Sequence, residues 1–429
     1  MKIASIAAGA AGMYCGSCLH DNTLAAALLD LGEDVILIPT YTPLRTDEPD
    51  VSHSRVFFGG INVFLQQKSV LFRHTPWWFD RLLDRPILLN SLSHRASSVD
   101  PTRLGDLTVS MLRGEDGNQH KELQKLARWL LKEVRPDVIQ LSNAMLLGMA
   151  RIFSGNLGPP VVCALTGEDS FLERLTQPYY DQARELLYER ARDVDAFTAF
   201  NSYYADRMSA YLSVDRAKIH VIRHGLRLEG HGSRSRSSEN APRVIGFLGR
   251  ICQDKGLHQL VEACELLDQM SDLPPFELRV AGYVGKAEQA YLQQVQNRVA
   301  GGTLAGRFSY LGEVSRTQKI AMLQSLDIFC VPALFPEAKG LSVLEAMANA
   351  VPAVLPDHGS FSELVQDTGG GLLCEPHNTV DLAAKLGELL LDAPRANQIG
   401  QAGQRAIYDR YHAERMAQQT RDLYRRVIC

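Results

Sequence analysis

Short apolar runs alternate with segments of helical periodicity along most of this chain. In the first half the apolar runs are residues 3–8, 35–39, 137–141 and 161–165, and a helical pattern over 19–31 separates the first two. Turn-forming Gly and Pro residues accompany these runs. A succession of strand, helix and strand predicts a parallel sheet with right-handed crossovers. We therefore expect a doubly wound α/β domain in the first half.

A polar segment interrupts this alternation, and the pattern then starts again. Residues 230–242 are small, polar or charged without periodicity, which is typical of a linker. At 429 residues the chain is also too long for one ordinary core. The expected division is two Rossmann-like domains with a linker between them and a closing amphipathic helix that packs back on the first domain: 1–230, 231–242, 243–402 and 403–429.

The charge balance limits the partners of the chain. Lys and Arg total 45 against 49 Asp and Glu, a net charge of -4, which argues against nucleic acid as the main partner. No apolar run approaches the roughly 20 residues that cross a bilayer. The first residues are predicted to be a strand and its loop rather than a signal peptide. A cytoplasmic location is expected.

The eight cysteines favour buried thiols over a metal centre. Cys163, Cys252, Cys264 and Cys330 lie inside apolar stretches and are expected to be buried. The pair in Cys15-Gly-Ser-Cys18 has redox or metal spacing, but no second Cys/His pair at zinc-like spacing accompanies it. No metal site is therefore predicted.

The segment 327–348 contains the most informative pattern. A buried strand ends near Pro332, a loop carries Glu337 and Gly340, and a helix starting at about Leu341 presents Glu345. A loop glycine allows close approach of a ligand, and the free N–H groups of a helix start favour phosphate. Eight residues at about 1.5 Å rise separate the carboxylates by about 12 Å, the span from a ribose to a sugar beyond a diphosphate. Two solvated surface acids are the alternative, but the strand–loop–helix setting favours a site.

A second segment, 244–256, carries two cations after a strand. The strand ends at Gly249, and Arg250 and Lys255 lie on the following loop. A forked guanidinium and a point-charge ammonium suit a diphosphate. The alternative is an exposed cationic loop. The segment is not a P-loop, because no G-x-x-x-x-G-K-[ST] pattern occurs.

Taken together, these motifs resemble the retaining glycosyltransferases of GT-B fold, the family 4 or group 1 type. The resemblance rests on Gly249-Arg250 with Lys255-Gly256 and on Glu337-x7-Glu345. Further matches occur at Gly282, Tyr310-Leu-Gly312, Asp327, Val331-Pro332, Gly359 and Glu363. The resemblance implies two Rossmann-like domains that face each other across a cleft, with a C-terminal helix that crosses back to the N-terminal, acceptor-binding domain.

The resemblance also implies a role for each matching position. Arg250 and Lys255 would bind the donor diphosphate, Glu345 the ribose hydroxyls and Glu337 the transferred sugar. The remaining donor-binding positions are Gly16, Gly249, Glu313, Val314, Ala338, Lys339, Gly340 and Leu341. Such enzymes retain the anomeric configuration and work without a metal or other cofactor. The nucleotide sugar is a substrate, and its base (UDP-, GDP- or ADP-linked) stays open.

The chain departs from the family pattern at three places. Lys339 stands where relatives usually have an aromatic residue, and Cys15-Gly16 replaces a Gly-Gly pair. In Thr166-Gly-Glu168-Asp169, Thr166 replaces a His that commonly helps to position the donor sugar. We expect Thr166, Glu168 and Asp169 to contribute to the sugar or acceptor site.

The acceptor is not identified by sequence; glycan, lipid-linked and small-molecule acceptors stay open. Residues 68–85 hold Trp77 and Trp78 among basic residues, which is typical either of an interfacial segment or of aromatics that fill the core. Peripheral contact at the inner face of the membrane is thus an alternative to a purely cytoplasmic protein.

Three other functions compete with sugar transfer. One is a degenerate nucleotide-sugar-binding protein, which the substitution at Thr166 motivates. Another is a different GT-B enzyme, such as a nucleotide-sugar epimerase or a glycan phosphorylase; no pyridoxal-phosphate lysine segment is recognisable for the latter. A dehydrogenase is disfavoured because no G-x-G-x-x-G follows a strand.

Overall fold

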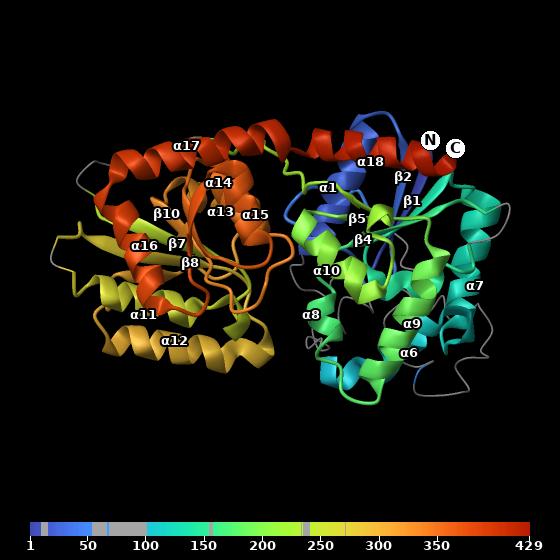
Figure 1. Cartoon of the computed structure of the whole chain (residues 1–429), viewed down its shortest axis with the longest axis horizontal. Helices are drawn as coiled ribbons and strands as arrows, with labels where there is room; N and C mark the ends of the chain where they lie inside the picture. The colour runs from blue at the N-terminus through green and yellow to red at the C-terminus, as the bar shows by residue number, and fades with distance from the viewer. Residues whose placement is uncertain are drawn as a thin grey trace. The chain divides into compact units, whose positions relative to one another are not determined.

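The computed structural model describes residues 1–9, 16–53, 67, 101–153, 158–232, 234, 241–270 and 272–429. These residues form two compact units (Figure 1). Unit 1 comprises Met1–Gly225 together with Ala413–Cys429, and unit 2 comprises Leu226–His412. The end of the chain therefore returns to the unit in which the chain begins.

Unit 1 is built on a parallel sheet with the strand order β2-β1-β3-β4-β5-β6. Its inner strands are almost entirely buried because helices cover both faces of a parallel sheet. In β4, for example, all five residues are buried. The strands are β1 (Lys2–Ala7), β2 (Asp34–Pro39), β3 (Val138–Leu141), β4 (Val161–Leu165), β5 (Ala196–Ala199) and β6 (Ile219–Val221).

Seven α-helices are described in unit 1. Local chemistry fixes the start of α10, where the Asn201 side chain accepts a hydrogen bond from the Tyr204 N–H and caps the helix. The helices are α1 (Gly16–Asp30), α6 (Pro101–Arg113), α7 (His120–Trp129), α8 (Asp169–Leu172), α9 (Tyr179–Arg190), α10 (Ser202–Leu212) and α18 (Ala413–Ile428).

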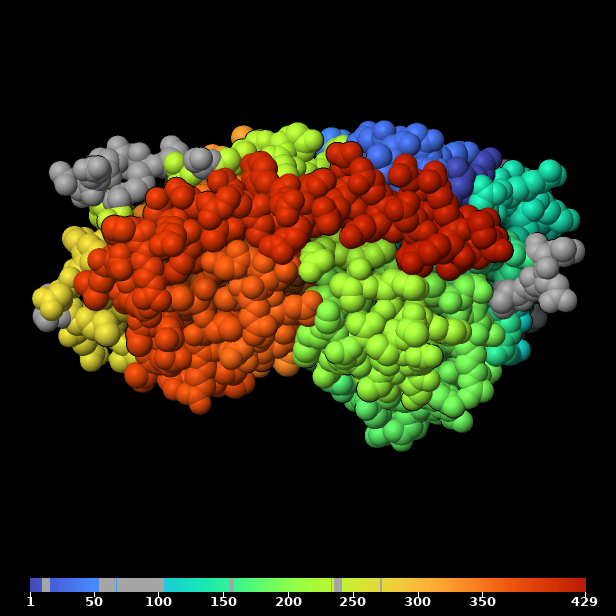
Figure 2. Space-filling model, turned by 45° about the horizontal axis from the view of Figure 1, so that its top comes forward, coloured from blue at the N-terminus to red at the C-terminus, as the bar shows by residue number. Residues whose placement is uncertain are grey.

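The C-terminal helix α18 is part of the core of unit 1. Its apolar face, with Met416, Leu423 and Tyr424, packs in one buried cluster with Leu24 and Leu28 of α1. Figure 2 shows α18 in red on the molecular surface beside the blue N-terminal segment. The expected return of this helix to the N-terminal domain is confirmed.

Unit 2 repeats the doubly wound plan, with the strand order β12-β11-β10-β7-β8-β9 and parallel pairing throughout. Its strands are β7 (Arg243–Leu248), β8 (Phe276–Ala281), β9 (Phe308–Tyr310), β10 (Ile328–Cys330), β11 (Ala353–Pro356) and β12 (Gly371–Cys374). Its helices are α11 (Leu257–Leu267), α12 (Gln289–Gly301), α13 (Arg316–Gln324), α14 (Leu341–Ala348), α15 (Ser360–Thr368), α16 (Thr379–Leu391) and α17 (Ala393–Arg410).

The strand order of unit 2 places its helices on both faces of the sheet. From β7 the chain steps outward to β8 and β9, and from β10 it steps in the opposite direction to β11 and β12. Because crossovers are right-handed, the helices of the two series lie on opposite faces. In Figure 1, α11 and α12 accordingly lie on one side of β7 and β8, and α14 and α15 on the other.

The unit boundaries differ from the positions expected from sequence. The chain leaves unit 1 at Gly225 rather than near residue 230, and it returns at Ala413 rather than near residue 403. The continuous helical pattern over 404–427 divides into α17 and α18 because the chain around Tyr411 is tied to unit 2. The Tyr411 hydroxyl donates to Asp367 Oδ2 (2.6 Å), and its carbonyl accepts from the Leu226 N–H (2.8 Å).

Two further expectations can be compared with the structure. Cys163, Cys252, Cys264 and Cys330 are all buried, as predicted. Among the described helices, none combines the length and the apolar character needed to cross a membrane.

Shortening Leu423 to Ala should destabilise unit 1 by about 2–5 kcal/mol, because this side chain is 1% exposed in the cluster shared with α1. Ile428→Ala on the same helix is the matched control, because Ile428 is 41% exposed and should cost well under 1 kcal/mol. Trp129 ends α7 of unit 1, and the other two tryptophans, Trp77 and Trp78, precede it in the sequence. Urea unfolding followed by tryptophan fluorescence therefore reports this unit, and equal midpoints for the two variants would contradict the docking of α18.

Candidate functional site

The strand order of unit 2 reverses between β7 and β10, which are direct neighbours in the sheet. In open α/β sheets, ligands bind outside the carboxyl ends of the strands at such a switch point. The loop that leaves β7 carries Gly249 to Gly256, and the loop that leaves β10 carries Val331 to Gly340. The two motifs singled out from sequence therefore meet at one edge of the sheet.

Backbone contacts hold these two loops together. The Leu334 N–H donates to the Asp254 carbonyl at 2.8 Å. Gly256 has φ +74°, and a Cβ placed there would lie 1.9 Å from the Pro332 carbonyl oxygen. Only glycine permits both this φ and this approach. Gly256 therefore sets the spacing between the two loops.

Glu337 and Lys255 form an ion pair across the two loops. Their side chains are 12% and 23% exposed, so both are partly desolvated but open to one side. The Lys255 ammonium also lies 5.4 Å from the centre of the Phe335 ring, within the range of a cation–π contact. The structure thus places a carboxylate and a cation, predicted from separate motifs, side by side.

The loop after β11 packs against the backbone of Glu337 and holds it in place. The Ser360 N–H donates to the Glu337 carbonyl at 2.7 Å. Gly359 has φ +64°, and a Cβ there would lie 2.6 Å from the Glu337 nitrogen. His358 Nε2 lies 3.0 Å from the Ala333 carbonyl, and because a carbonyl only accepts, this nitrogen carries the proton. Burial lowers the pKa of His358, which favours this neutral form.

Glu345 lies in the second turn of α14 and is buried, with 4% exposure. Its Oε1 is 2.5 Å from the Lys319 ammonium of α13, a side chain that is also buried. The Glu345 backbone carbonyl accepts from the Asn349 side chain at 2.8 Å. Gly340, with φ +69°, starts the helix and so fixes the direction in which the first N–H groups point. Glu345 is therefore a buried carboxylate paired with Lys319, and not a solvated surface acid.

The neighbouring strand ends extend this edge through glycine contacts. The Gly282 N–H after β8 donates to the Gly312 carbonyl after β9 at 2.8 Å. Gly282 has φ +148°, and a Cβ there would lie 1.7 Å from the Gly249 carbonyl oxygen. The loops after β7, β8 and β9 are therefore packed backbone to backbone.

The other predicted donor-site residues of unit 2 lie on these loops with different exposures. Arg250 and Glu313 are exposed, and Val314 is half-buried against the core of unit 2. In the loop after β10, Ala338 is buried and Lys339 is half-buried, and Leu341 opens α14. These residues share one edge of the sheet with the Lys255–Glu337 pair.

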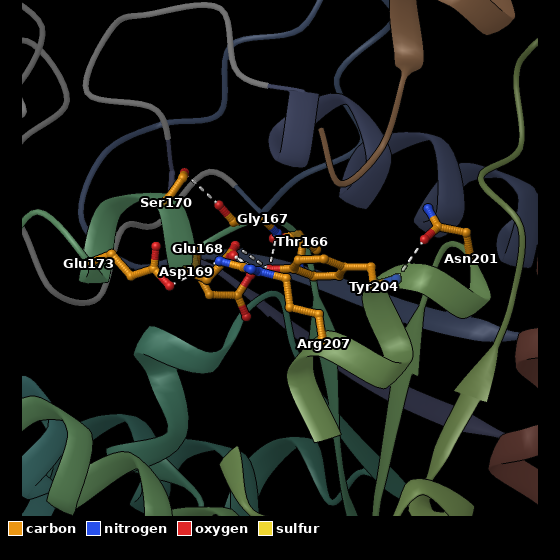
Figure 3. A network of polar contacts seen from close by, with 9 residues as sticks. All are labelled: Thr166, Gly167, Glu168, Asp169, Ser170, Glu173, Asn201, Tyr204 and Arg207. Carbon is orange, nitrogen blue, oxygen red and sulfur yellow. Dashed lines mark hydrogen bonds and ion pairs between the residues drawn. The ribbon is translucent and has the colours of Figure 1, made fainter. Parts of the chain in front are cut away.

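The predicted residues of unit 1 lie in a polar network at the end of β4 (Figure 3). Glu168 is buried and accepts from the Ala144 N–H at 2.8 Å and from the Thr166 N–H at 2.6 Å. Burial raises the pKa of its carboxyl group. Glu168 thereby ties the loop after β3 to the loop after β4.

Thr166 and Asp169 serve the same loop. The Ser17 hydroxyl near the start of α1 donates to Thr166 Oγ1 at 3.2 Å. Asp169 accepts from the Tyr204 hydroxyl at 2.8 Å and from Arg207 Nε at 2.6 Å (Figure 3). Through these contacts, Thr166 and Asp169 fix the positions of α1, α8 and α10 relative to one another at the carboxyl end of the sheet.

Some sequence predictions fall outside the described residues. These are Cys15 with its Cys15–Cys18 spacing and the aromatic-basic segment 68–85. Gly16 is described and is the first residue of α1.

Sequence reasoning missed two residues of the site in unit 2. Lys319 was not singled out, although it precedes the buried residues Met322 and Leu323 by three and four positions and so falls on the apolar face of α13. A charge on an apolar face was the available signal. His358 carried no signal, because its contact with Ala333 joins two loops that are distant in sequence.

Removing the charge of Lys319 should destabilise unit 2 strongly. Lys319→Met leaves the Glu345 carboxylate buried without this cation, at a cost of about 3–5 kcal/mol, and adding Glu345→Gln should recover part of the loss. Arg298→Met is the control; it breaks an exposed pair with Glu265 and should cost about 0–1 kcal/mol. Far-UV circular dichroism during urea unfolding measures this. If Lys319→Met and Arg298→Met lowered the free energy of unfolding equally, the result would contradict a buried pair of Lys319 and Glu345.

The stability of unit 2 should fall as pH decreases below the ordinary histidine pKa. The folded state holds the pKa of His358 below 6.5, so its contribution is present above that pH and is lost as pH falls through the lowered value. His358→Gln keeps an N–H donor for Ala333 and removes the titration, so the loss of stability between pH 7.5 and pH 5 should be smaller. Val380→Ala in the same unit is the control, because this side chain is 69% exposed and does not titrate, so the slope should be unchanged.

Comparison with known proteins gives two family matches. The model described as glycosyl transferases group 1 matches residues 233–406, and the model described as glycosyltransferase family 4 matches residues 107–229. Together they span more than half of the chain.

Curated relatives agree with these family matches. The chain is 30% identical over 257 residues to alpha-maltose-1-phosphate synthase of Mycolicibacterium smegmatis, covering 54% of this chain and 63% of that protein. It is 24% identical over 233 residues to glycogen synthase of Mycobacterium tuberculosis, covering 54% of each. The chain thus spans about half the length of the curated relatives it matches.

Solved structures share the fold over the whole chain. Sucrose-phosphate synthase from Thermosynechococcus elongatus superposes with a TM-score of 0.72 at 15% identity, covering 100% of this chain and 99% of that one. HepE of Anabaena, solved in complex with UDP, gives 0.68 at 18% identity, covering 99% and 100%. With two Rossmann-like units, a returning C-terminal helix and these family matches, the chain belongs to the group 1, family 4 type of glycosyltransferases and has the GT-B fold.

Proposed function

We propose that this protein transfers a sugar from a nucleotide-diphosphate-sugar donor to an acceptor hydroxyl. The observation that carries this proposal is the pairing of Glu337 with Lys255 at the switch point between β7 and β10. A cation beside a carboxylate at this edge matches a donor with a charged diphosphate and a hydroxyl-rich sugar. UDP-, GDP- and ADP-linked sugars are the candidate donors.

The names of relatives support a nucleotide-linked donor. HepE of Anabaena has been solved with UDP and with UDP-glucose, and TarM of S. aureus with UDP. The curated relatives include synthases and mannosyltransferases. We therefore assign the nucleotide sugar as substrate, with no separate cofactor.

The loops suggest how each residue would act. Lys255 and Arg250 would neutralise the diphosphate as the bond from the anomeric carbon to the phosphate oxygen breaks. The N–H groups at the start of α14, including that of Leu341, would share this charge without a metal. Glu337 would accept hydrogen bonds from hydroxyls of the sugar. Glu345 offers a second carboxylate oxygen besides the one facing Lys319, which suits the ribose hydroxyls.

We further propose transfer with retention of anomeric configuration. The acceptor hydroxyl would attack the face that the nucleotide leaves, forming the new carbon–oxygen bond, and its proton would pass to the departing phosphate oxygen. This step needs no protein nucleophile. Gly249, Gly16, Glu313, Val314, Ala338, Lys339 and Gly340 are proposed to line the donor. Thr166, Glu168 and Asp169 are proposed to shape the sugar or acceptor side.

The acceptor and the location complete the proposal. A glycan, a lipid-linked sugar and a small molecule all fit as acceptors, and we propose a cytoplasmic enzyme whose 68–85 segment allows peripheral contact with a membrane. The main alternative is a degenerate nucleotide-sugar-binding protein. The observation that favours it is Thr166, whose hydroxyl is bonded to Ser17 within the fold.

Glu337→Ala and Lys255→Ala should each reduce transfer at least a hundredfold, because both remove contacts that strengthen as the donor bond breaks. Glu345→Ala should chiefly weaken nucleotide binding. Thermal-shift screening against UDP-, GDP- and ADP-sugars identifies the donor, and release of nucleotide then measures transfer and the slow hydrolysis of the donor.

Glu262→Ala provides the control, because Glu262 on α11 of the same unit is 45% exposed and should leave turnover unchanged. Normal rates for both the Glu337 and the Glu345 variants would contradict the assigned donor site. Donor binding with neither transfer nor hydrolysis would favour the degenerate binding protein instead.

A further inference from the structure

Unit 1 carries a pocket that none of the roles above uses. It is an open hollow of about 560 Å³ lined by Glu173, Tyr203, Asp206, Arg207, Ala210 and Tyr211. Five of these residues follow one face of α10 at helical spacing, and Glu173 directly follows α8. The volume lies within the range of about 300–1,000 Å³ that is usual for small-ligand sites.

The polar network at the end of β4 holds this pocket in shape. Arg207 donates through Nε to Asp169 at 2.6 Å and through Nη2 to Glu173 at 2.9 Å (Figure 3). Asp169 is buried and also accepts from the Tyr204 hydroxyl. A planar guanidinium that is held by two carboxylates has little freedom. The α10 face is therefore fixed relative to α8.

Two tyrosines give the pocket aromatic surface. The Arg184 guanidinium lies over the Tyr211 ring, 3.5 Å from its centre, and Arg184 is not among the lining residues. The guanidinium therefore fixes the ring from outside the pocket. Burial raises the pKa of Tyr203 and raises that of Tyr211 to about 12, so both hydroxyl groups stay protonated at neutral pH.

The charges of the lining favour an uncharged, hydroxyl-rich ligand. Two of the six residues are acids and one is a base. Glu173 pairs with Arg207, and Asp206 pairs with Arg216 at 2.5 Å, so each carboxylate keeps oxygens that can accept from hydroxyl groups. Together with Asp169, Arg184 and Arg216 beside the lining, the carboxylates and guanidinium groups balance, so no net positive charge attracts a phosphate or another anion. Aromatic faces beside carboxylates suit the C–H faces and hydroxyl groups of a pyranose.

We propose that this pocket binds a neutral saccharide chain, as the acceptor or as the part of a longer acceptor beyond its reacting end. The role as acceptor rests on the proposed sugar transfer, but binding itself does not. The proposal narrows the acceptor class to an uncharged glycan or to a molecule that carries one.

Saturation-transfer NMR and calorimetry without any nucleotide sugar test the binding. The probes are maltoheptaose, α-1,6-mannotetraose and cellotetraose, with a heparin tetrasaccharide as the anionic comparison. At least one neutral probe should bind, and the anionic probe should bind more weakly. Tyr203→Ala should weaken binding roughly tenfold because it removes an aromatic face. Ala210→Trp should abolish binding by filling the pocket from an exposed position.

Tyr188→Ala is the matched control. Tyr188 is an exposed tyrosine of α9 with Arg192 over its ring at 4.5 Å, and it does not line the pocket. Tryptophan fluorescence of unit 1 checks that each variant is folded. Absence of binding by all three neutral probes, or equal loss in Tyr188→Ala and Tyr203→Ala, would overturn the proposal. If the protein bound a saccharide but transferred no sugar, the result would contradict the proposed function and would still support saccharide binding in this pocket.

Discussion

The pairing of β10 beside β7 is the constraint on which the candidate site depends. Both strands run in the same direction, so the loops that leave their carboxyl ends emerge at the same edge of the sheet. Residues separated by about eighty positions in the chain thus become neighbours, as Lys255 and Glu337 do. The reversal of strand order at this point sends the following helices to opposite faces, and a crevice between the two loops is the usual result in such sheets.

The site of unit 2 is built from charges held in place by their surroundings. Glu345 faces Lys319 in a buried pair, and Glu337 faces Lys255 in a partly open one. Burial of single charges is costly, and paired charges with fixed geometry reduce that cost. The deeper pair gives rigidity, whereas the more open pair keeps charge accessible at the edge of the sheet. This difference agrees with the separate roles proposed for the two glutamates.

Unit 1 uses buried carboxylates for a different purpose. Glu168 and Asp169 are adjacent in sequence, yet one binds backbone N–H groups of two loops and the other binds Tyr204 and Arg207. The carboxylates of Glu168 and Asp169 therefore both stabilise the loops and helices at the ends of the strands. The pocket along α10 depends on that rigidity, because Arg207 belongs both to the network and to the lining. Far along the chain, α18 completes the core of the same unit.

The sequence by itself determined the fold class and most of the donor motif. Alternating apolar runs and helical segments specify parallel strands with crossovers, and Gly256 and Gly340 mark loops whose backbone conformation few other residues adopt. These features are local, so periodicity and residue type reveal them. The pairing of Lys255 with Glu337, the contact of Lys319 with Glu345 and the support from His358 are not local. They depend on strand order and on which helix face is buried, and only the tertiary structure decides these.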